Sequence, residues 1–326
     1  MCIRDSSAGP QRTPGVQEAA EERSLGLRRT VVETASGPVV ARVGVPRDGR
    51  VVLLIHGAAG SWRGWLPVLR AAADTGLPLT DAVAVDLPGW GESPDPQRPL
   101  DATSAAEAVA AVAASTGAER WTVVGHSLGG LVALALAAQR PDATEAVVLV
   151  SPTGPAVLDT IRHPVLAGRR LPWFAGMLLV MRVLAALPGA GRPLLRTVGR
   201  IGLLGRLAGP LLADRRHTDP EVLQAFGEEV RPAAFLRATR STLDGPPLPW
   251  DAIRCPVHSV RGRHDVFVGR GDAEWFAAVL PDFAETRVAD AGHFALAERP
   301  DVVLDVLRAV EGHGSAGTCR RIDPRR

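Results

Sequence analysis

Residues 121–139 have the sequence WTVVGHSLGGLVALALAAQ. The first four are bulky and mostly β-branched, as is typical of a buried strand, and the leucine- and alanine-rich residues from Leu128 to Gln139 favour a helix. Between them lies Gly125-His126-Ser127-Leu128-Gly129, in which two glycines permit a tight turn. The segment therefore predicts a strand, a sharp turn with a serine at its apex, and a helix.

The same alternation continues on both sides of this segment. Short apolar runs predict strands, and several are continuous rather than alternating, as expected for strands covered on both faces. Alanine- and leucine-rich stretches between them predict helices. This order predicts an α/β fold: a mostly parallel sheet with helices on both faces. The expected strands are Thr30–Glu33, Pro38–Val45, Val51–Ile55, Ala82–Val85, Trp121–Val124, Ala146–Val150, Val257–Val260 and Thr286–Ala289, and the expected helices are Trp65–Ala73, Thr103–Ala114, Leu128–Gln139, Asp272–Leu280 and Pro300–Val310.

One long stretch interrupts this alternation. Residues 152–250 carry no clear strand but several apolar stretches punctuated by arginine. A loop of roughly a hundred residues is far longer than compact domains use, so we expect an inserted helical cap there. The cap divides the core into a first half at 29–151 and a second half at 251–311.

The two ends of the chain differ from the core in composition. Residues 1–28 are rich in Gly, Pro, Gln and Glu, and residues 312–326 are Gly-rich and basic. Neither has a sustained apolar period, so we expect a disordered arm and a disordered tail. The first six residues, MCIRDS, resemble the translation of a transposon end used in sequencing libraries and are excluded from the fold prediction.

The apex serine has partners in the expected order along the chain. A serine hydroxyl is a weak nucleophile and needs a base. His293 follows the last expected strand, and Asp265 follows the strand before it. Carboxyl ends of parallel strands meet at one edge of the sheet, so we expect Ser127 as nucleophile, His293 as base and Asp265 as the acid that orients the imidazole. Asp290 is closer to His293 in sequence, but from the entry of that loop its side chain readily points away.

A fourth segment supports this chemistry. His56-Gly57-Ala58-Ala59-Gly60-Ser61 directly follows the strand Val51–Ile55. Acyl transfer passes through a tetrahedral oxyanion, and backbone N–H groups aimed at it stabilise the transition state. We expect the N–H groups of Ala58 and Leu128 to form this oxyanion hole, because both lie in turns beside Ser127.

Together these segments resemble the α/β-hydrolase superfamily with an inserted cap, over residues 30–310. HGAAGS resembles the oxyanion loop of that family, DLPGWGES (86–93) its D-x-P-G-x-G-x-S loop, GHSLGG its nucleophile turn, and GRHD and AGHF its acid and base loops. The resemblance implies a serine esterase or lipase-like enzyme that cleaves an ester or related acyl bond through an acyl-enzyme intermediate. It implies a small-molecule acyl substrate, no cofactor and no catalytic metal.

Other activities on the same fold remain to be compared. Epoxide hydrolases and haloalkane dehalogenases resemble this chain but carry Asp where this chain has Ser127, which disfavours both. Carbon–carbon bond hydrolases share the serine and the cap but have a longer Gly-Pro oxyanion loop. Cofactor-free perhydrolases and haloperoxidases share the whole triad and stay open. A non-catalytic accessory protein also stays open, because fold does not fix function.

Composition excludes several classes of partner. The 326 residues include 37 basic and 35 acidic side chains, a net charge of +2 that provides no basic field for nucleic acid. Three scattered cysteines are too few for a disulfide framework or a zinc site. The N-terminus lacks the basic, apolar and small-residue regions of a secretory signal, which predicts a cytoplasmic protein.

The cap contains an unusually apolar run, Leu171–Leu187, with the sequence LPWFAGMLLVMRVLAAL. It is shorter than the ~20 residues that span a bilayer and contains Pro172 and Arg182, so we expect no transmembrane span. We favour a cap helix that packs on the core and lines an acyl pocket. The alternative is an interfacial surface that touches lipid, with arginines at its edge. Three tryptophans in nearby loops line the site or pack in the core: Trp62, Trp65 and Trp90.

Overall fold

The computed structural model describes residues 14–98, 100–187, 197, 209–213, 218, 229–245 and 247–314. Within them lies one eight-stranded sheet with the order β1-β2-β4-β3-β5-β6-β7-β8. β1 pairs antiparallel with β2, β2 pairs antiparallel with β4, and all other pairs are parallel. The strands are β1 (Arg28–Thr34), β2 (Gly37–Val43), β3 (Arg50–Ile55), β4 (Ala82–Val85), β5 (Arg120–His126), β6 (Thr144–Val150), β7 (Val257–Gly262) and β8 (Phe283–Val288).

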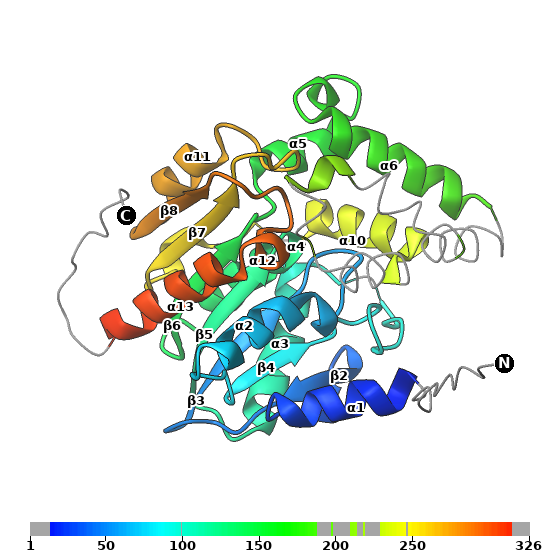
Figure 1. The fold of residues 1–326 in the computed structure, drawn as a ribbon. Coiled ribbons are helices and arrows are strands. Elements are labelled where there is room, and N and C mark those ends of the chain that lie inside the picture. Colours follow the sequence, from blue (N-terminus) through cyan, green and yellow to red (C-terminus); the bar gives the residue numbers. More distant parts are fainter. Residues whose placement is uncertain are drawn as a thin grey trace, which may run out of the picture.

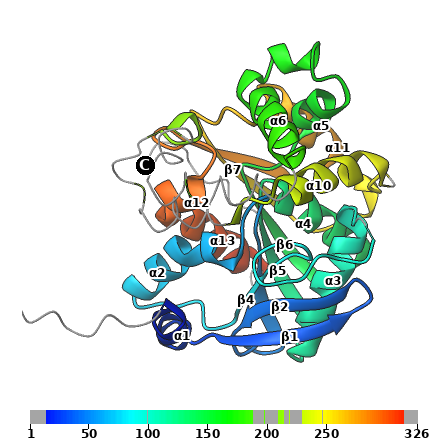
Figure 2. The ribbon, with the colours of Figure 1, turned by 90° about the vertical axis from the view of Figure 1, so that its right-hand side faces the viewer.

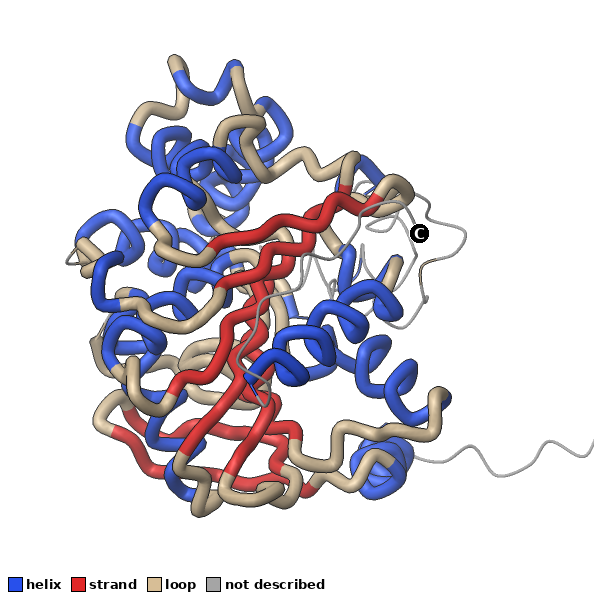
Figure 3. The backbone as a smooth tube through the Cα atoms, turned by 90° about the vertical axis from the view of Figure 1, so that its left-hand side faces the viewer, coloured by secondary structure: helices blue, strands red, loops and turns tan. Residues whose placement is uncertain are grey.

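Helices cover both faces of this sheet (Figure 3). One apolar cluster packs α3 and α4 on one face, and a second packs α2, α12 and α13 on the other. The core helices are α2 (Leu66–Asp74), α3 (Ala102–Ser115), α4 (Leu128–Gln139), α11 (Asp272–Val279), α12 (Ala295–Glu298) and α13 (Pro300–Gly314), and the short 3₁₀ turns are η1 (Trp62–Trp65), η2 (Ala167–Arg169), η3 (Gly209–Leu211) and η4 (Trp250–Ala252).

The continuous apolar runs are explained by this two-sided burial. Leu53 and Ile55 of β3 belong to the first cluster, whereas Val52 and Leu54 belong to the second. Since neighbouring side chains of a strand point to opposite faces, both sets must be apolar. The predicted α/β fold with a mostly parallel sheet is confirmed.

β8 begins earlier than the sequence pattern predicts, at Phe283 rather than Thr286. This strand lies at the edge of the sheet, and most of its residues are only partly buried. Its first half is Phe283-Ala284-Glu285, in which the charged Glu285 interrupts the apolar run, and an edge strand tolerates such an interruption. Phe283 is fixed there by stacking on Phe276 of α11, with ring centroids 5.7 Å apart.

The prediction of a disordered arm at residues 1–28 is wrong for its second half. Residues Pro14–Ser24 form helix α1. The helix is held by Arg42 of β2, a buried guanidinium that pairs with Glu22 at 2.7 Å and with Glu18 at 3.4 Å. Composition alone missed this helix because its anchor is a buried cation on another element. Residues 1–13 lie outside the described residues.

The other end of the core is also longer than expected. Helix α13 continues to Gly314, four residues beyond the predicted end at Val310. Residues 312–314 therefore belong to a helix and not to the tail. The rest of the predicted tail, residues 315–326, lies outside the described residues.

Three described helices lie between β6 and β7 in the chain: α5 (Pro155–Arg162), α6 (Pro172–Ala185) and α10 (Pro232–Asp244). They gather at one end of the molecule, with α6 on the outside and α10 between α6 and the core (Figure 1, Figure 2). They fall within residues 152–250, where the sequence predicts a helical cap. Much of that range lies outside the described residues, so its limits stay a prediction.

Candidate active site

Ser127 lies at the sharp turn between β5 and α4. Its backbone has φ 52° and ψ −117°, a conformation that costs a residue other than glycine about 1–3 kcal/mol. A Cβ on Gly129 would lie 2.3 Å from the carbonyl oxygen of Ile55, and one on Gly125 would lie 2.4 Å from that of Gly129. Both glycines are therefore required by close backbone approach, as the sequence motif predicts.

Asp265 and His293 meet at the same sheet edge. Nδ1 of His293 lies 3.1 Å from each carboxylate oxygen of Asp265. Both side chains are buried, with 6% and 1% of their surface exposed for His293 and Asp265. The loops that carry them are joined by main-chain hydrogen bonds, including one from His264 N–H to the Ala291 carbonyl at 3.0 Å. The pair is thus held in place by the fold around it.

The carboxylate of Asp265 is held in its charged form. Burial alone would raise its pKa, but the adjacent His293 and the hydrogen bonds that it accepts hold the pKa below the ordinary range. One of those bonds comes from the N–H of Phe267 at 2.8 Å, and another from Val268 at 3.2 Å. A charged, oriented carboxylate at Nδ1 fixes the proton there and leaves Nε2 free for a reacting group.

The competing acid, Asp290, has a different partner. Its carboxylate accepts a hydrogen bond of 2.7 Å from Nη1 of Arg299. The Asp290 side chain is 64% exposed. The structure therefore brings Asp265 to the imidazole and places Asp290 in a surface ion pair.

The loop after β3 approaches Ser127 closely. A Cβ on Gly57 would lie 2.9 Å from Cβ of Ser127, and Ala58 and Leu128 line the same cavity as the serine. Leu128 is the first residue of α4, where the N–H groups of a helix have no partner within the helix. Ala59 has a positive φ of 63°, and the turn closes with a 3.2 Å bond from Gly60 N–H to the Gly57 carbonyl.

His56 fixes this loop from inside the protein. Its Nε2 accepts a hydrogen bond from the N–H of Leu87 at 3.0 Å, so the ring proton lies on Nδ1 and is donated to the Gly57 carbonyl at 2.7 Å. Burial lowers the pKa of His56 to about 4. This neutral histidine therefore ties the loop after β3 to the loop after β4.

His126 is a site residue that the sequence analysis passed over. Its ring lies 5.0 Å from the ring of His293, and its Nε2 lies 3.1 Å from the His293 carbonyl oxygen, to which it donates. Burial, with a smaller effect from His293, lowers its pKa to about 3. Its place directly before Ser127 was visible in the sequence, but the contact with a histidine far along the chain was not.

The motif at residues 86–93 has a structural role beside the site. The carboxylate of Asp86 accepts hydrogen bonds from the N–H of Trp62 at 2.8 Å and of Glu92 at 2.9 Å. Burial raises its pKa to about 6. A Cβ on Gly91 would lie within 2.6 Å of this carboxylate, which explains the glycine.

Two contacts attach the returning cap segment to these loops. Arg231 donates through Nη1 to the carbonyl of Gly89 at 2.7 Å and through Nη2 to the carbonyl of Gly91. The hydroxyl of Ser61, in the loop after β3, donates to Glu229. The cap is thus joined to the segments that surround Ser127.

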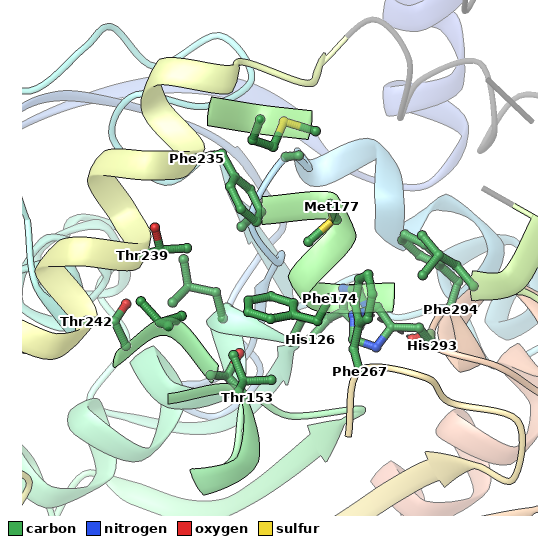
Figure 4. A pocket seen from close by; sticks show the side chains of 18 residues that line it. His126, Thr153, Phe174, Met177, Phe235, Thr239, Thr242, Phe267, His293 and Phe294 are labelled. Atoms are coloured by element: carbon green, nitrogen blue, oxygen red, sulfur yellow. Dashed lines mark hydrogen bonds between the residues drawn. The ribbon is translucent and has the colours of Figure 1, made fainter. Parts of the chain in front are cut away.

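Ser127 and His293 line one cavity between the core and the helices α6 and α10. Figure 4 shows His293 beside this cavity, with Phe174 and Phe235 on the side of the two helices. None of the cavity's described lining residues is Asp, Glu or Arg. The face of α6 that turns inward contributes Phe174, Met177 and Met181, while α10 contributes Phe235, Thr239 and Thr242. Such a cavity suits a neutral, apolar group.

The three loop tryptophans do not line this cavity. Trp62 and Trp65 are buried in the apolar cluster below α2, α12 and α13, and Trp90 is buried in the cluster on the opposite face. Trp90 lines a neighbouring cavity that shares Leu128 and Thr242 with the first. Of the two interpretations, core packing is the one that the structure supports.

Comparison with known proteins places this chain in a family. A model described as the alpha/beta hydrolase family matches residues 52–306. The chain therefore belongs to the alpha/beta hydrolase family.

The individual relatives share about a third or less of their sequence with this chain over most of its length. The chain is 28% identical over 263 residues to an uncharacterized protein of Mycobacterium tuberculosis, covering 80% of this chain and 74% of that protein. It is 30% identical over 271 residues to a pimeloyl-[acyl-carrier protein] methyl ester esterase of Neisseria meningitidis, covering 75% and 80%. A crystal structure of a bacterial membrane phospholipase A superposes with a TM-score of 0.67 at 19% identity, covering 93% and 91%.

Two features are absent from the part of the chain that the structure describes. In that part of the chain, no helix is long and apolar enough to cross a membrane. The same residues contain no group of three or more His, Cys, Asp or Glu side chains arranged to hold a metal ion.

Proposed function

We propose that this protein is a serine hydrolase that cleaves a carboxylic ester through an acyl-enzyme intermediate. The observation that carries the proposal is the buried Asp265–His293 pair, of which His293 lines the same cavity as the strained Ser127. A surface histidine with a structural role would not need a buried carboxylate at Nδ1 beside a serine in this backbone conformation.

The proposed reaction has two halves. Oγ of Ser127 attacks the ester carbonyl carbon while Nε2 of His293 accepts its proton, and Asp265 stabilises the imidazolium that forms. His293 then gives the proton to the departing alcohol, which leaves an acyl-enzyme. Water attacks the acyl group by the same route and releases the acid.

The oxyanion of each tetrahedral intermediate needs stabilisation. We assign this to the N–H groups of Ala58 and Leu128, which belong to the loop and the helix end that flank Ser127. Each such donor is worth about 2.7–4 kcal/mol in acyl transfer. The glycine at position 57 is what allows this loop to approach the serine so closely.

The cavity supports a neutral acyl substrate with an apolar chain. Its described lining has no Asp, Glu or Arg side chain that would pair with a charged acyl group, and it includes four phenylalanine and two methionine side chains. The methyl ester esterase among the relatives supports ester cleavage.

The test combines covalent labelling with turnover. The purified protein should react with a fluorophosphonate probe and hydrolyse p-nitrophenyl esters of graded chain length. Ser127→Ala should abolish labelling and lower turnover by at least about 10⁴-fold. Ser127, His293 and Asp265 are proposed to act together, so loss of the nucleophile removes the contribution of all three. Ser36→Ala, in the turn between β1 and β2, is the matched control and should behave like the parent.

Two results would contradict the proposal. An unlabelled protein that turns over none of the esters would favour a non-catalytic role. Turnover that survives in Ser127→Ala, with the probe still bound, would place the nucleophile elsewhere.

A further inference from the structure

Helix α6 presents apolar side chains on both of its faces. Its inward face lines the cavity with Phe174, Met177 and Met181. Its outward face lies on the outer edge of the molecule (Figure 1). That face, the residue pair before η2 and Leu187 just after α6 expose large apolar side chains, with exposed fractions from 43% for Leu187 to 78% for Val165: Val165, Leu166, Trp173, Leu179, Val180, Val183 and Leu187.

This outward face is unlike that of an ordinary surface helix. A helix that covers a core usually has a polar outer side, and one that is apolar all round is normally buried. Monomeric soluble proteins rarely expose contiguous apolar patches of large area. The apolar residues of α6 recur on the outward side at the spacing of a helical face, which distinguishes them from singly scattered exposed residues.

Arginine is the prevailing charged residue around this face. Residues 160–213 contain eight arginines and neither Asp nor Glu. Four of these arginines, Arg162, Arg169, Arg170 and Arg182, are described and exposed. Carboxylates lie only at its margin: Asp159 is 3.9 Å from Arg170, and Asp265 and Asp272 line a cavity beside Arg170 and Trp173.

We propose that the outward face of α6, with Val165 and Leu166, docks on an anionic lipid bilayer. The apolar side chains enter the boundary between headgroups and acyl chains, Trp173 lies at headgroup level, and the arginines contact the phosphates. With 14 residues, α6 is too short to cross the bilayer and lies in its plane. Charge favours lipid over a second copy of the chain, since two such faces would bring arginines against arginines.

The experiment is flotation of the purified full chain with lipid vesicles. Vesicles of equal parts phosphatidylcholine and phosphatidylglycerol should bind the protein, and vesicles of phosphatidylcholine alone should bind it much less. Added salt should weaken the binding, because it screens the arginines. The double variant Val180→Glu, Val183→Glu should bind about tenfold less or weaker still, because charge replaces apolar surface in the contact.

The matched control is the double variant Val45→Glu, Leu77→Glu, which changes two exposed apolar residues outside the cap. It should bind anionic vesicles like the parent. Both double variants should hydrolyse a soluble ester at the parental rate, because none of the four residues lines the Ser127 cavity.

Three outcomes would overturn the proposal. One is a parent protein that does not float with anionic vesicles. Another is unchanged binding in Val180→Glu, Val183→Glu. The third is a parent that binds no vesicle but forms a dimer in sedimentation velocity, with the dimer lost in this variant; the face would then join two copies. Flotation measures binding and not turnover, so its result is independent of the ester hydrolysis proposed above.

Discussion

Asp265 and Asp290 are the two acids considered as the partner of His293, but the structure gives them different partners. Asp265 is buried against Nδ1 of the imidazole, and Asp290 is paired with Arg299 at the surface. The two acids have different partners because they lie on different loops after their strands. Asp265 lies on the loop that packs against the loop of His293, whereas the carboxylate of Asp290 is turned toward α13 at its N-terminal end, where Arg299 precedes the helix.

This difference predicts unequal effects of two matched substitutions. Asp265→Asn should lower kcat on an activated ester by up to about 10⁴-fold, because the amide no longer selects the tautomer or stabilises the imidazolium. Asp290→Asn should stay close to the parent, because it loses only an exposed ion pair worth about 0–1 kcal/mol.

Both variants are to be assayed on one ester, with circular dichroism to confirm folding. A large loss in Asp290→Asn together with near-parental activity in Asp265→Asn would reverse the assignment of the acid.

At the scale of single elements, α6 controls the cavity through one of its faces. Met177 and Met181 line the cavity, and Leu178 between them is buried in the apolar core. Leu179 points outward and is 60% exposed. The same helix therefore offers an inward site and an outward control site two residues apart.

A larger side chain at the inward position should narrow the cavity and shorten the preferred acyl chain. We expect Met177→Trp to lower the kcat/KM for a long-chain p-nitrophenyl ester relative to a short one by about tenfold, equal to about 1.4 kcal/mol of steric cost. Leu179→Trp should leave the chain-length profile unchanged. Equal profiles in Met177→Trp and the parent would show that the acyl chain lies elsewhere.

Elements were predictable from the sequence where a local signal decides them. The strand, turn and helix around Ser127 carry their own pattern in glycines and apolar runs. Helix α1 carries no such pattern, because it is held by the buried charge of Arg42 on β2. The first half of edge strand β8 was not predicted, because Glu285 interrupts its apolar run and an edge position tolerates such a residue.

The candidate site divides in the same way. Chain order after successive strands was enough to select Ser127, Asp265 and His293. The contact of His126 with His293, and the cavity wall shared by α6 and α10, join segments far apart in the sequence. Such contacts arise from packing in three dimensions, so no local pattern indicates them.

For the molecule as a whole, two buried histidines make stability depend on pH. Burial lowers the pKa of His56 to about 4 and that of His126 to about 3, whereas in the unfolded chain both titrate near about 6.5. Below pH ~6.5 the unfolded chain therefore binds protons that the folded chain refuses. Each histidine thus contributes stability above its unfolded pKa that is lost as the pH falls toward its folded pKa.

A single substitution isolates one of these contributions. His126→Gln should make the free energy of unfolding fall less steeply between pH ~6.5 and 4, by up to about 1.4 kcal/mol per pH unit. Urea unfolding at several pH values measures this slope, and comparison of variants cancels opposing groups such as Asp86. The exposed His264→Gln is the control. An identical slope in parent and His126→Gln would contradict a neutral, buried His126.

Two methionines make the wall of the Ser127 cavity sensitive to oxidants. The chain has three methionines, Met1, Met177 and Met181, and the latter two line the Ser127 cavity. Peroxide converts a methionine thioether to a polar sulfoxide, so mild oxidation would damage the acyl-binding wall before the rest of the fold. Long-chain ester turnover should fall in dilute hydrogen peroxide, and Met177→Leu, Met181→Leu should resist, since leucine keeps the volume. An enzyme that forms peracids would oxidise these two methionines with its own product, which argues against perhydrolase activity. If the double variant is as sensitive to peroxide as the parent, the methionines are not the cause and this argument fails.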